Sequence, residues 1–204
     1  MAAISGRLGL ADEVYLRSLT GYLFGTELVG DLDRIAIIAL PDRICMSLAA
    51  SVASSYISKN GYKASEGRIR VYQYGDDVRR IVEEFKPNAV VLLYGGEHRL
   101  SEVREAFMNT LRELSKSGFN GTLVIHVRIL LATNRLNDVL SDESLVAYLN
   151  SLKEVRTFTA DLAQGKFFYH KVKFTEAGIQ MEKIGESSLT SEHVSLLKAS
   201  LPPT

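Results

Sequence analysis

The chain has 204 residues, of which 46% are hydrophobic and 24% are charged, a composition typical of a globular protein with one domain or one domain and a small appendage. Its 24 lysine and arginine residues equal its 24 aspartate and glutamate residues, so the formal net charge is zero, which argues against a strongly basic nucleic-acid binder. The single Cys45 cannot form an internal disulfide, no apolar run reaches the ~18 residues of a membrane span, and the N-terminal sequence lacks the layout of a signal peptide, so we expect a cytoplasmic protein.

Apolar residues at helical spacing predict a first helix over residues 11–24, and Gly25 and Gly30 predict a break after it. From Arg34 onward, short apolar or alternating runs alternate with amphipathic segments. The predicted strands cover residues 34–40, 68–74, 89–94 and 122–129, and the predicted helices cover residues 42–59, 76–85 and 101–116. Asp42 stands at the N-cap position of the first of these helices, and Gly61 is its expected C-terminal cap. Strands separated by helices of this length predict right-handed crossovers and a parallel sheet.

The pattern changes after this region. A helix over residues 142–155 precedes two strands, which flank a turn at Glu176-Ala177-Gly178 and predict an antiparallel hairpin over residues 166–174 and 179–184. A last helix is predicted over residues 191–201. We therefore expect an α/β fold with an open, mainly parallel sheet of four to five strands, flanking helices, and a C-terminal β-hairpin and helix. The expected parts are an N-terminal helical segment, an α/β core, and a hairpin and terminal helix packed on the same domain (residues 1–33, 34–160 and 161–204).

The candidate site residues follow the predicted strands, because ligands of open α/β sheets bind beyond the carboxyl ends of the strands. The turn after the first strand has no glycine, which argues against a dinucleotide or P-loop site. Several acidic and histidine side chains could converge on a metal ion, but Arg43 and Arg128 among them would repel it. These candidate ligands are Asp42, Asp76, Glu97, His98 and His126.

Each candidate also has a structural interpretation. We interpret Asp42 first as a helix N-cap, His126 as a packed histidine in an apolar strand, and Cys45 as a buried, unreactive thiol. The pair Glu97 and His98 is the best remaining catalytic candidate, and it would belong to a metal-dependent phosphoesterase.

The stretch ALPDRICMSLAASVASSYISKNGY, residues 39–62, resembles the opening motif of the DHH phosphoesterase family, which includes the RecJ-like exonucleases. That motif reads H-x-D-P-D-G-I and is followed by a helix of small residues. Pro41, Asp42 and Ile44 match it. The motif's histidine, first aspartate and glycine are replaced here by Ile38, Leu40 and Arg43.

The resemblance extends from about residue 34 to about residue 130. Tyr94 stands where the family has its next metal-binding aspartate, and the name-giving Asp-His-His falls on His126, Val127 and Arg128. Of the family's metal ligands, Asp42 alone is retained. The resemblance therefore implies an inactivated domain with no catalytic residue, metal or cofactor, in which Leu40, Asp42, Arg43, Tyr94, His126, Val127 and Arg128 are vestigial motif positions.

Inactivated members of this family resemble the cell-division-cycle subunit of the CMG replicative helicase and its archaeal counterparts. The resemblance implies a non-catalytic scaffold subunit of a DNA-replication complex. Its partners would be the GINS complex and the MCM helicase, with a weak single-stranded DNA contact and nucleoid association through those partners. The alternative outside this family is a Rossmann-like, CARF-type sensor that binds a small nucleotide at the loop of Gly95 and Gly96.

The predicted hairpin offers a candidate protein interface. If Phe168, Val172 and Phe174 face the core, strict alternation places the intervening side chains outside. The outward residues would be Phe167, Tyr169, Lys171 and Lys173. Packing of this face against the last helix is an equally good interpretation.

Overall fold

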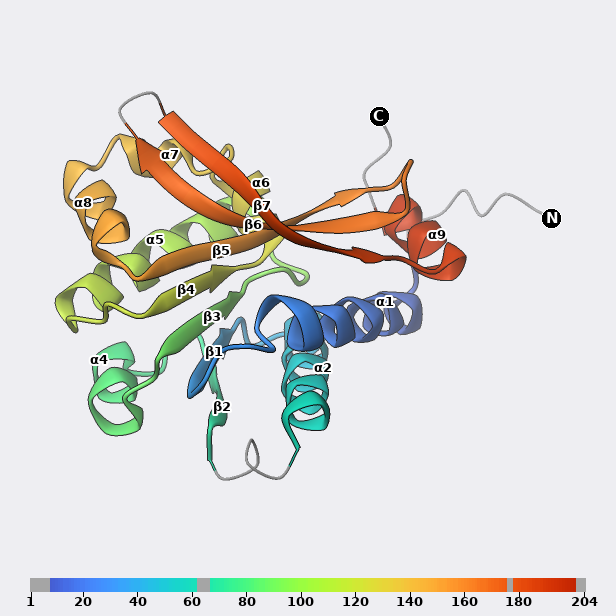
Figure 1. Ribbon diagram of the computed structural model, residues 1–204, viewed down its shortest axis with the longest axis horizontal. Helices are drawn as coiled ribbons and strands as arrows, with labels where there is room; N and C mark the ends of the chain where they lie inside the picture. The colour runs from blue at the N-terminus through green and yellow to red at the C-terminus, as the bar shows by residue number, and fades with distance from the viewer. Residues whose placement is uncertain (1–7, 62–66, 176–177, 201–204) are drawn as a thin grey trace.

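A twisted sheet runs through the computed structural model, which describes residues 8–61, 67–175 and 178–200 (Figure 1). Within those residues the sheet has seven strands in the order β2-β1-β3-β4-β5-β6-β7. They are β1 (Ile35–Ala39), β2 (Ile69–Gln73), β3 (Ala89–Leu93), β4 (Thr122–Ile125), β5 (Glu154–Asp161), β6 (Lys166–Thr175) and β7 (Gly178–Ser188). The first five strands are parallel, and β6 and β7 are antiparallel to their neighbours. The predicted mainly parallel α/β fold with a C-terminal hairpin and helix is confirmed, and the sheet is larger than expected.

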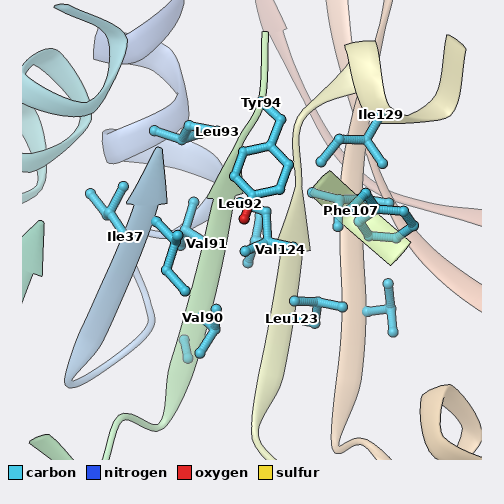
Figure 2. Packing of buried hydrophobic residues seen from close by; sticks show 14 of the residues in the cluster. Ile37, Val90, Val91, Leu92, Leu93, Tyr94, Phe107, Leu123, Val124 and Ile129 are labelled. Carbon is cyan, nitrogen blue, oxygen red and sulfur yellow. The ribbon is translucent and has the colours of Figure 1, made fainter. Parts of the chain in front are cut away.

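The central strands are buried on both faces. All five residues of β1 and of β3 are buried, as their continuous apolar sequences IAIIA and AVVLL predict. Figure 2 shows the β3 side chains packed between Ile37 of β1 and Val124 of β4. Burying one such side chain contributes roughly 1.5–3 kcal/mol, so these strands form the stable centre of the fold.

Helices cover both faces of the parallel part of the sheet. Helices α1 and α2 lie side by side on one face, and α4, α5 and α8 lie on the other (Figure 1). The helices are α1 (Leu10–Leu23), α2 (Arg43–Asn60), α4 (Val78–Arg80), α5 (Leu100–Lys116), α6 (Val127–Ala132), α7 (Asn137–Leu140), α8 (Glu143–Ser151) and α9 (Ser191–Ser200), with π-helical turns η1 (Phe24–Leu28) and η2 (Ile81–Phe85). In the described part of the chain, no helix is both long enough and apolar enough to cross a bilayer.

The predicted break lies at Gly30 and Asp31, which form a turn. Gly25 is not part of the break, because the first helix continues into the π-helical turn η1. A side chain at Gly25 would collide with Ser55 Oγ and would lie 2.5 Å from the backbone oxygen of Val52 on α2. The Ser55 hydroxyl also donates to the Gly21 carbonyl, 3.2 Å away. Glycine therefore serves here to let α1 and η1 approach α2 closely, and it does not end the helix.

The predicted strand over residues 122–129 is too long. Strand β4 ends at Ile125, and His126 is the N-cap of α6, where its Nδ1 accepts a hydrogen bond from the Arg128 backbone N–H at 3.2 Å. The apolar sequence VIHVRILLA crosses the boundary between strand and helix, so its periodicity does not reveal that boundary.

The predicted helix over residues 142–155 ends at Ser151, and its last residues begin β5. This unpredicted strand pairs in parallel with β4 and in antiparallel with β6. It therefore joins the hairpin to the parallel sheet. The described residues of the C-terminal segment thus continue the same sheet.

The predicted outward face of the hairpin is wrong at its aromatic positions. Phe167 and Tyr169 are only 2% and 4% exposed. The pairing of β6 with β7 shifts register between Tyr169 and His170. The extra residue at this shift is Ile184 of β7, so it does not displace the residues of β6. The buried positions of β6 nevertheless change from odd numbers to Val172 and Phe174, which shows that opposite faces of the strand are covered in its two halves.

The two lysines of that predicted interface have ion-pair partners within the sheet. Lys171 lies 3.5 Å from Glu154, and Lys173 lies 2.7 Å from Glu182. The turn residues Glu176 and Ala177, and Leu201 of the predicted last helix, lie outside the described residues.

Substitution of Gly25 by alanine tests the close contact between η1 and α2. Because the new methyl group would meet backbone as well as side-chain atoms, Gly25→Ala should lower the free energy of unfolding by about 1–3 kcal/mol in urea titrations. Gly185→Ala is the matched control, because its Cβ would lie 3.4 Å from Tyr169 Cδ2, an ordinary contact. The control should change stability by less than about 0.5 kcal/mol. Equal stability of the two variants would contradict this packing.

Candidate functional site

An open pocket of about 530 Å³ lies at the carboxyl ends of β1 and β3. The chain leaves these neighbouring strands toward opposite sides of the sheet, so the pocket occupies the topological switch point where ligands of such folds bind. The β1–α2 and β3–α5 connections supply its lining. The lining residues are Pro41, Asp42, Arg43, Glu97, His98, Arg99 and Glu102.

Asp42 is the N-cap of α2, as the sequence predicted. Its Oδ1 accepts hydrogen bonds from the backbone N–H groups of Ile44 at 2.9 Å and Cys45 at 2.8 Å. The side chain is only 8% exposed. Its second oxygen, Oδ2, is buried and has no hydrogen-bond partner among the described residues, and His98 Nε2 lies 3.7 Å from it. Asp42 therefore combines a structural hydrogen bond with an unsatisfied acceptor that faces the pocket lining.

His98 lies between two carboxylates, but Glu97 is not one of them. The Nδ1 atom of His98 lies 3.2 Å from Glu102 Oε2, which also accepts from the Arg99 backbone N–H at 2.9 Å. Glu97 instead pairs with Arg43 at 3.2 Å, and both side chains are largely exposed. The predicted Glu97–His98 pair is therefore replaced by the array Asp42–His98–Glu102.

Glu102 and Arg99 were not among the predicted site residues. The sequence does contain a signal for Glu102, since residues four apart at a helix start lie on one face and can interact. The polar lining of the pocket therefore depends on the first turn of α5 as much as on the strand ends.

The loop after β3 fits closely against the neighbouring loops because it begins with two glycines. A side chain at Gly96 would collide with both carboxylate oxygens of Asp42, and one at Gly95 would lie 2.6 Å from His126 Cε1. The Gly95 N–H also donates to Cys45 Sγ at 3.2 Å. Burial, followed by the charge of Asp42, raises the pKa of the Cys45 thiol to about 12. Cys45 is therefore a buried, protonated thiol, as its sequence position predicted.

Three vestigial motif positions carry side chains with structural roles. Leu40 is 3% exposed and belongs to the core. Tyr94 is fully buried, and its hydroxyl lies 2.8 Å from Thr110 Oγ1 (Figure 2). Burial, followed by the charges of Arg17 and Arg128, lowers the pKa of His126 to about 3, so this imidazole stays neutral.

The other three positions lie on helices or at the pocket rim. Val127 and Arg128 form the start of α6, and the Arg128 Nη2 donates to the His98 carbonyl at 2.6 Å. Arg43 is the first residue of α2, with a side chain that is 69% exposed. The motif positions therefore bring arginines, and not further carboxylates, to the neighbourhood of Asp42, and the carboxylates of Glu97 and Glu102 in the pocket lining lie outside the motif. In the part of the chain that the structure describes, no three His, Cys, Asp or Glu side chains are grouped to hold a metal ion.

Helix α1 brings two further, partly buried charges to this edge of the sheet, which the sequence did not reveal as site residues. Arg17 Nη2 lies 3.0 Å from Glu13 Oε2, and these side chains are 12% and 21% exposed. Burial lowers the pKa of Arg17, while the negative charges of Glu13 and Asp42 act in the opposite direction. The Nε atoms of Arg17 and Arg128 are buried without a hydrogen-bond partner among the described residues. Arg17 and Arg128 therefore both place positive charge near His126 at the carboxyl edge of the sheet.

Comparisons with known proteins give one distant curated relative and several distant structural likenesses. A protein of Aquifex aeolicus described as "Uncharacterized protein" is 28% identical over 110 residues, which cover 53% of this chain and 51% of the relative. The chain therefore spans about half the length of that relative.

Two solved structures illustrate the structural likenesses. The C-domain of LpoA (YraM) from Haemophilus influenzae, a regulator of PBP1A, is 14% identical, with a TM-score of 0.47 over 76% of this chain and 42% of that one. The leucine-binding protein LivK from Thermotoga maritima is 10% identical, with a TM-score of 0.39 over 75% of this chain and 39% of that one. With TM-scores below 0.5, neither likeness carries an argument about function.

The match to a family model is more extensive. The model is described as "Uncharacterized protein", and it matches residues 13–196, which include most of α1, the whole described sheet and the pocket. The chain belongs to this family.

Proposed function

We propose that the chain is a non-catalytic, DHH-like domain that works as a scaffold subunit of a DNA-replication complex. The non-catalytic part of this proposal rests on the structural roles of the side chains at the motif positions after the strands. Leu40 and Tyr94 fill the core, and Asp42 caps α2. A site that kept its metal ions would present carboxylates at these three positions.

The electrostatics of the edge support the same proposal. Metal-assisted phosphoester hydrolysis needs ions that generate hydroxide and stabilise developing charge, and two-metal sites hold them about 3.5–4 Å apart. Asp42 is the one motif carboxylate here, and one of its oxygens already accepts two backbone hydrogen bonds. Arg128 on α6 and Arg17 on α1 add positive charge around it. Cations would be repelled where the family binds them.

The choice of assembly comes from the sequence resemblance. It implies GINS and MCM as partners, a cytoplasmic protein associated with the nucleoid, and contact with single-stranded DNA that is weak at most. The zero net charge fits a subunit held by proteins better than one that grips DNA alone. An exposed aromatic face on α1, formed by Tyr15 and Tyr22 at 43% and 57% exposure, replaces the hairpin as the proposed partner surface.

Affinity purification of the tagged chain from its native cells tests the assembly. We expect GINS or MCM subunits among the recovered proteins, and we expect Tyr22→Ala to reduce their recovery. Leu131→Ala is the matched control, since Leu131 on α6 is also an exposed apolar residue, at 63%. Recovery of other proteins only, or equal recovery with both variants, would refute the partner or the surface, respectively.

Unfolding experiments on Asp42 variants test whether this residue is structural. Asp42→Ala removes the N-cap of an 18-residue helix and should cost about 1–2 kcal/mol of unfolding free energy, whereas Asp42→Asn keeps an acceptor and should cost only a few tenths. Urea titrations in a chelator measure both values. A carboxylate maintained only to bind cations would behave differently, since Asp42→Ala would then be as stable as the wild type or more stable.

A further inference from the structure

We propose that the pocket at the switch point binds a small molecule that carries two neighbouring hydroxyl groups and a phosphate, such as a sugar or polyol phosphate. This ligand site goes beyond the scaffold function, which needs no small molecule and does not depend on one.

The hydroxyl end of the ligand is defined by Asp42 and His98. Asp42 Oδ2 is an unsatisfied acceptor on a side chain that is 92% buried, and such an atom is costly unless something donates to it. The Glu102 carboxylate can only accept, so Nδ1 of His98 carries the hydrogen of that contact, and in the neutral imidazole Nε2, 3.7 Å from Asp42 Oδ2, is a second acceptor. Two neighbouring hydroxyl groups of a ligand fit this pair, because one can donate to Asp42 Oδ2 and the other to His98 Nε2.

The phosphate end is defined by the start of α5 and two arginines. Asp42 caps α2, but the residue at the same position of α5 is Arg99, which has no acceptor atom. Glu102 accepts from the Arg99 N–H, but the N-cap side chain accepts no hydrogen bond from the first N–H groups of this 17-residue helix, so these groups can bind an anion. Arg99 and Arg43 both line the pocket beside them.

Arg43, at the rim of the pocket, can exchange its ion pair with Glu97 for a contact with a ligand. The Arg43–Glu97 pair joins two side chains that are 69% and 46% exposed, and such exposed pairs are weak. Arg43 can therefore turn from Glu97 to a phosphate, which it can bind through two parallel hydrogen bonds. The pocket volume of about 530 Å³ lies within the range of small-molecule sites and accommodates a three- to six-carbon phosphate.

Isothermal titration calorimetry of the full chain with three probes tests both halves of the site. The probes are inorganic phosphate, glycerol and glycerol 3-phosphate, which carry the anion alone, the hydroxyls alone and both together. We expect glycerol 3-phosphate to bind at least about tenfold more tightly than inorganic phosphate, as one hydrogen bond to a charged group allows. If it binds no more tightly than phosphate, or binds not at all, the proposed site is wrong.

Two variants separate the ends of the site. Asp42→Asn keeps an N-cap acceptor but replaces the second oxygen by a donor, so it should weaken glycerol 3-phosphate about tenfold and leave inorganic phosphate unchanged or slightly tighter. Arg99→Ala should weaken both probes. Asp77→Asn and Arg79→Ala are the matched controls, because Asp77 caps α4 and Arg79 pairs with Glu83, outside the pocket lining.

The pattern of losses decides the proposal. Equal weakening of both probes by Asp42→Asn would contradict the hydroxyl contact, and an effect of the control variants as large as that of Arg99→Ala would contradict the phosphate contact. Far-UV circular dichroism of each variant establishes that the fold is retained. Because none of these measurements involves GINS or MCM, their outcome is independent of the proposed scaffold function.

Discussion

Asp42 connects the elements that meet at the carboxyl edge of the sheet. It stands where β1 ends, and its Oδ1 holds the first N–H groups of α2. Its carboxylate packs directly against the Cα of Gly96 in the β3–α5 loop, which is why that position tolerates no side chain. Its second oxygen faces His98, so α2, the loop and the pocket all depend on one carboxylate.

This arrangement links the fold to the proposed loss of chemistry. A carboxylate that caps a helix gives up one oxygen to backbone donors, and it is then a poorer ligand for a cation. Leu40 and Tyr94 are buried in the core at positions where the resembled family has metal-binding aspartates. In our proposal, this edge keeps the geometry of a ligand site and binds a polar organic ligand in place of metal ions.

The sequence predicted the parallel part of the fold well, because IAIIA and AVVLL can be buried only in a sheet that is covered on both faces. It failed where the surroundings change along one element. Opposite faces of β6 are buried in its two halves, which strict alternation could not predict, and the continuous apolar run around His126 hid the end of β4. Strand β5 was missed because it follows a helix after a very short connection.

The candidate site was predicted only in part for a related reason. Asp42 and the loop at Gly95 and Gly96 could be found from their places after strands. Arg17, by contrast, reaches the edge from a helix that is distant in sequence, and no local pattern marks such a contact. The role of Glu102 depended on where α5 begins, and boundaries of this kind depend on tertiary packing.

The central claim is that the strand ends are occupied by structural side chains and no longer hold metal ions. Anomalous diffraction from crystals grown in excess manganese tests it most directly. The account predicts no manganese within coordination distance of Asp42, with its Oδ1 still bound to the backbone of α2. Two ordered manganese ions coordinated by Asp42 and its neighbours would contradict it.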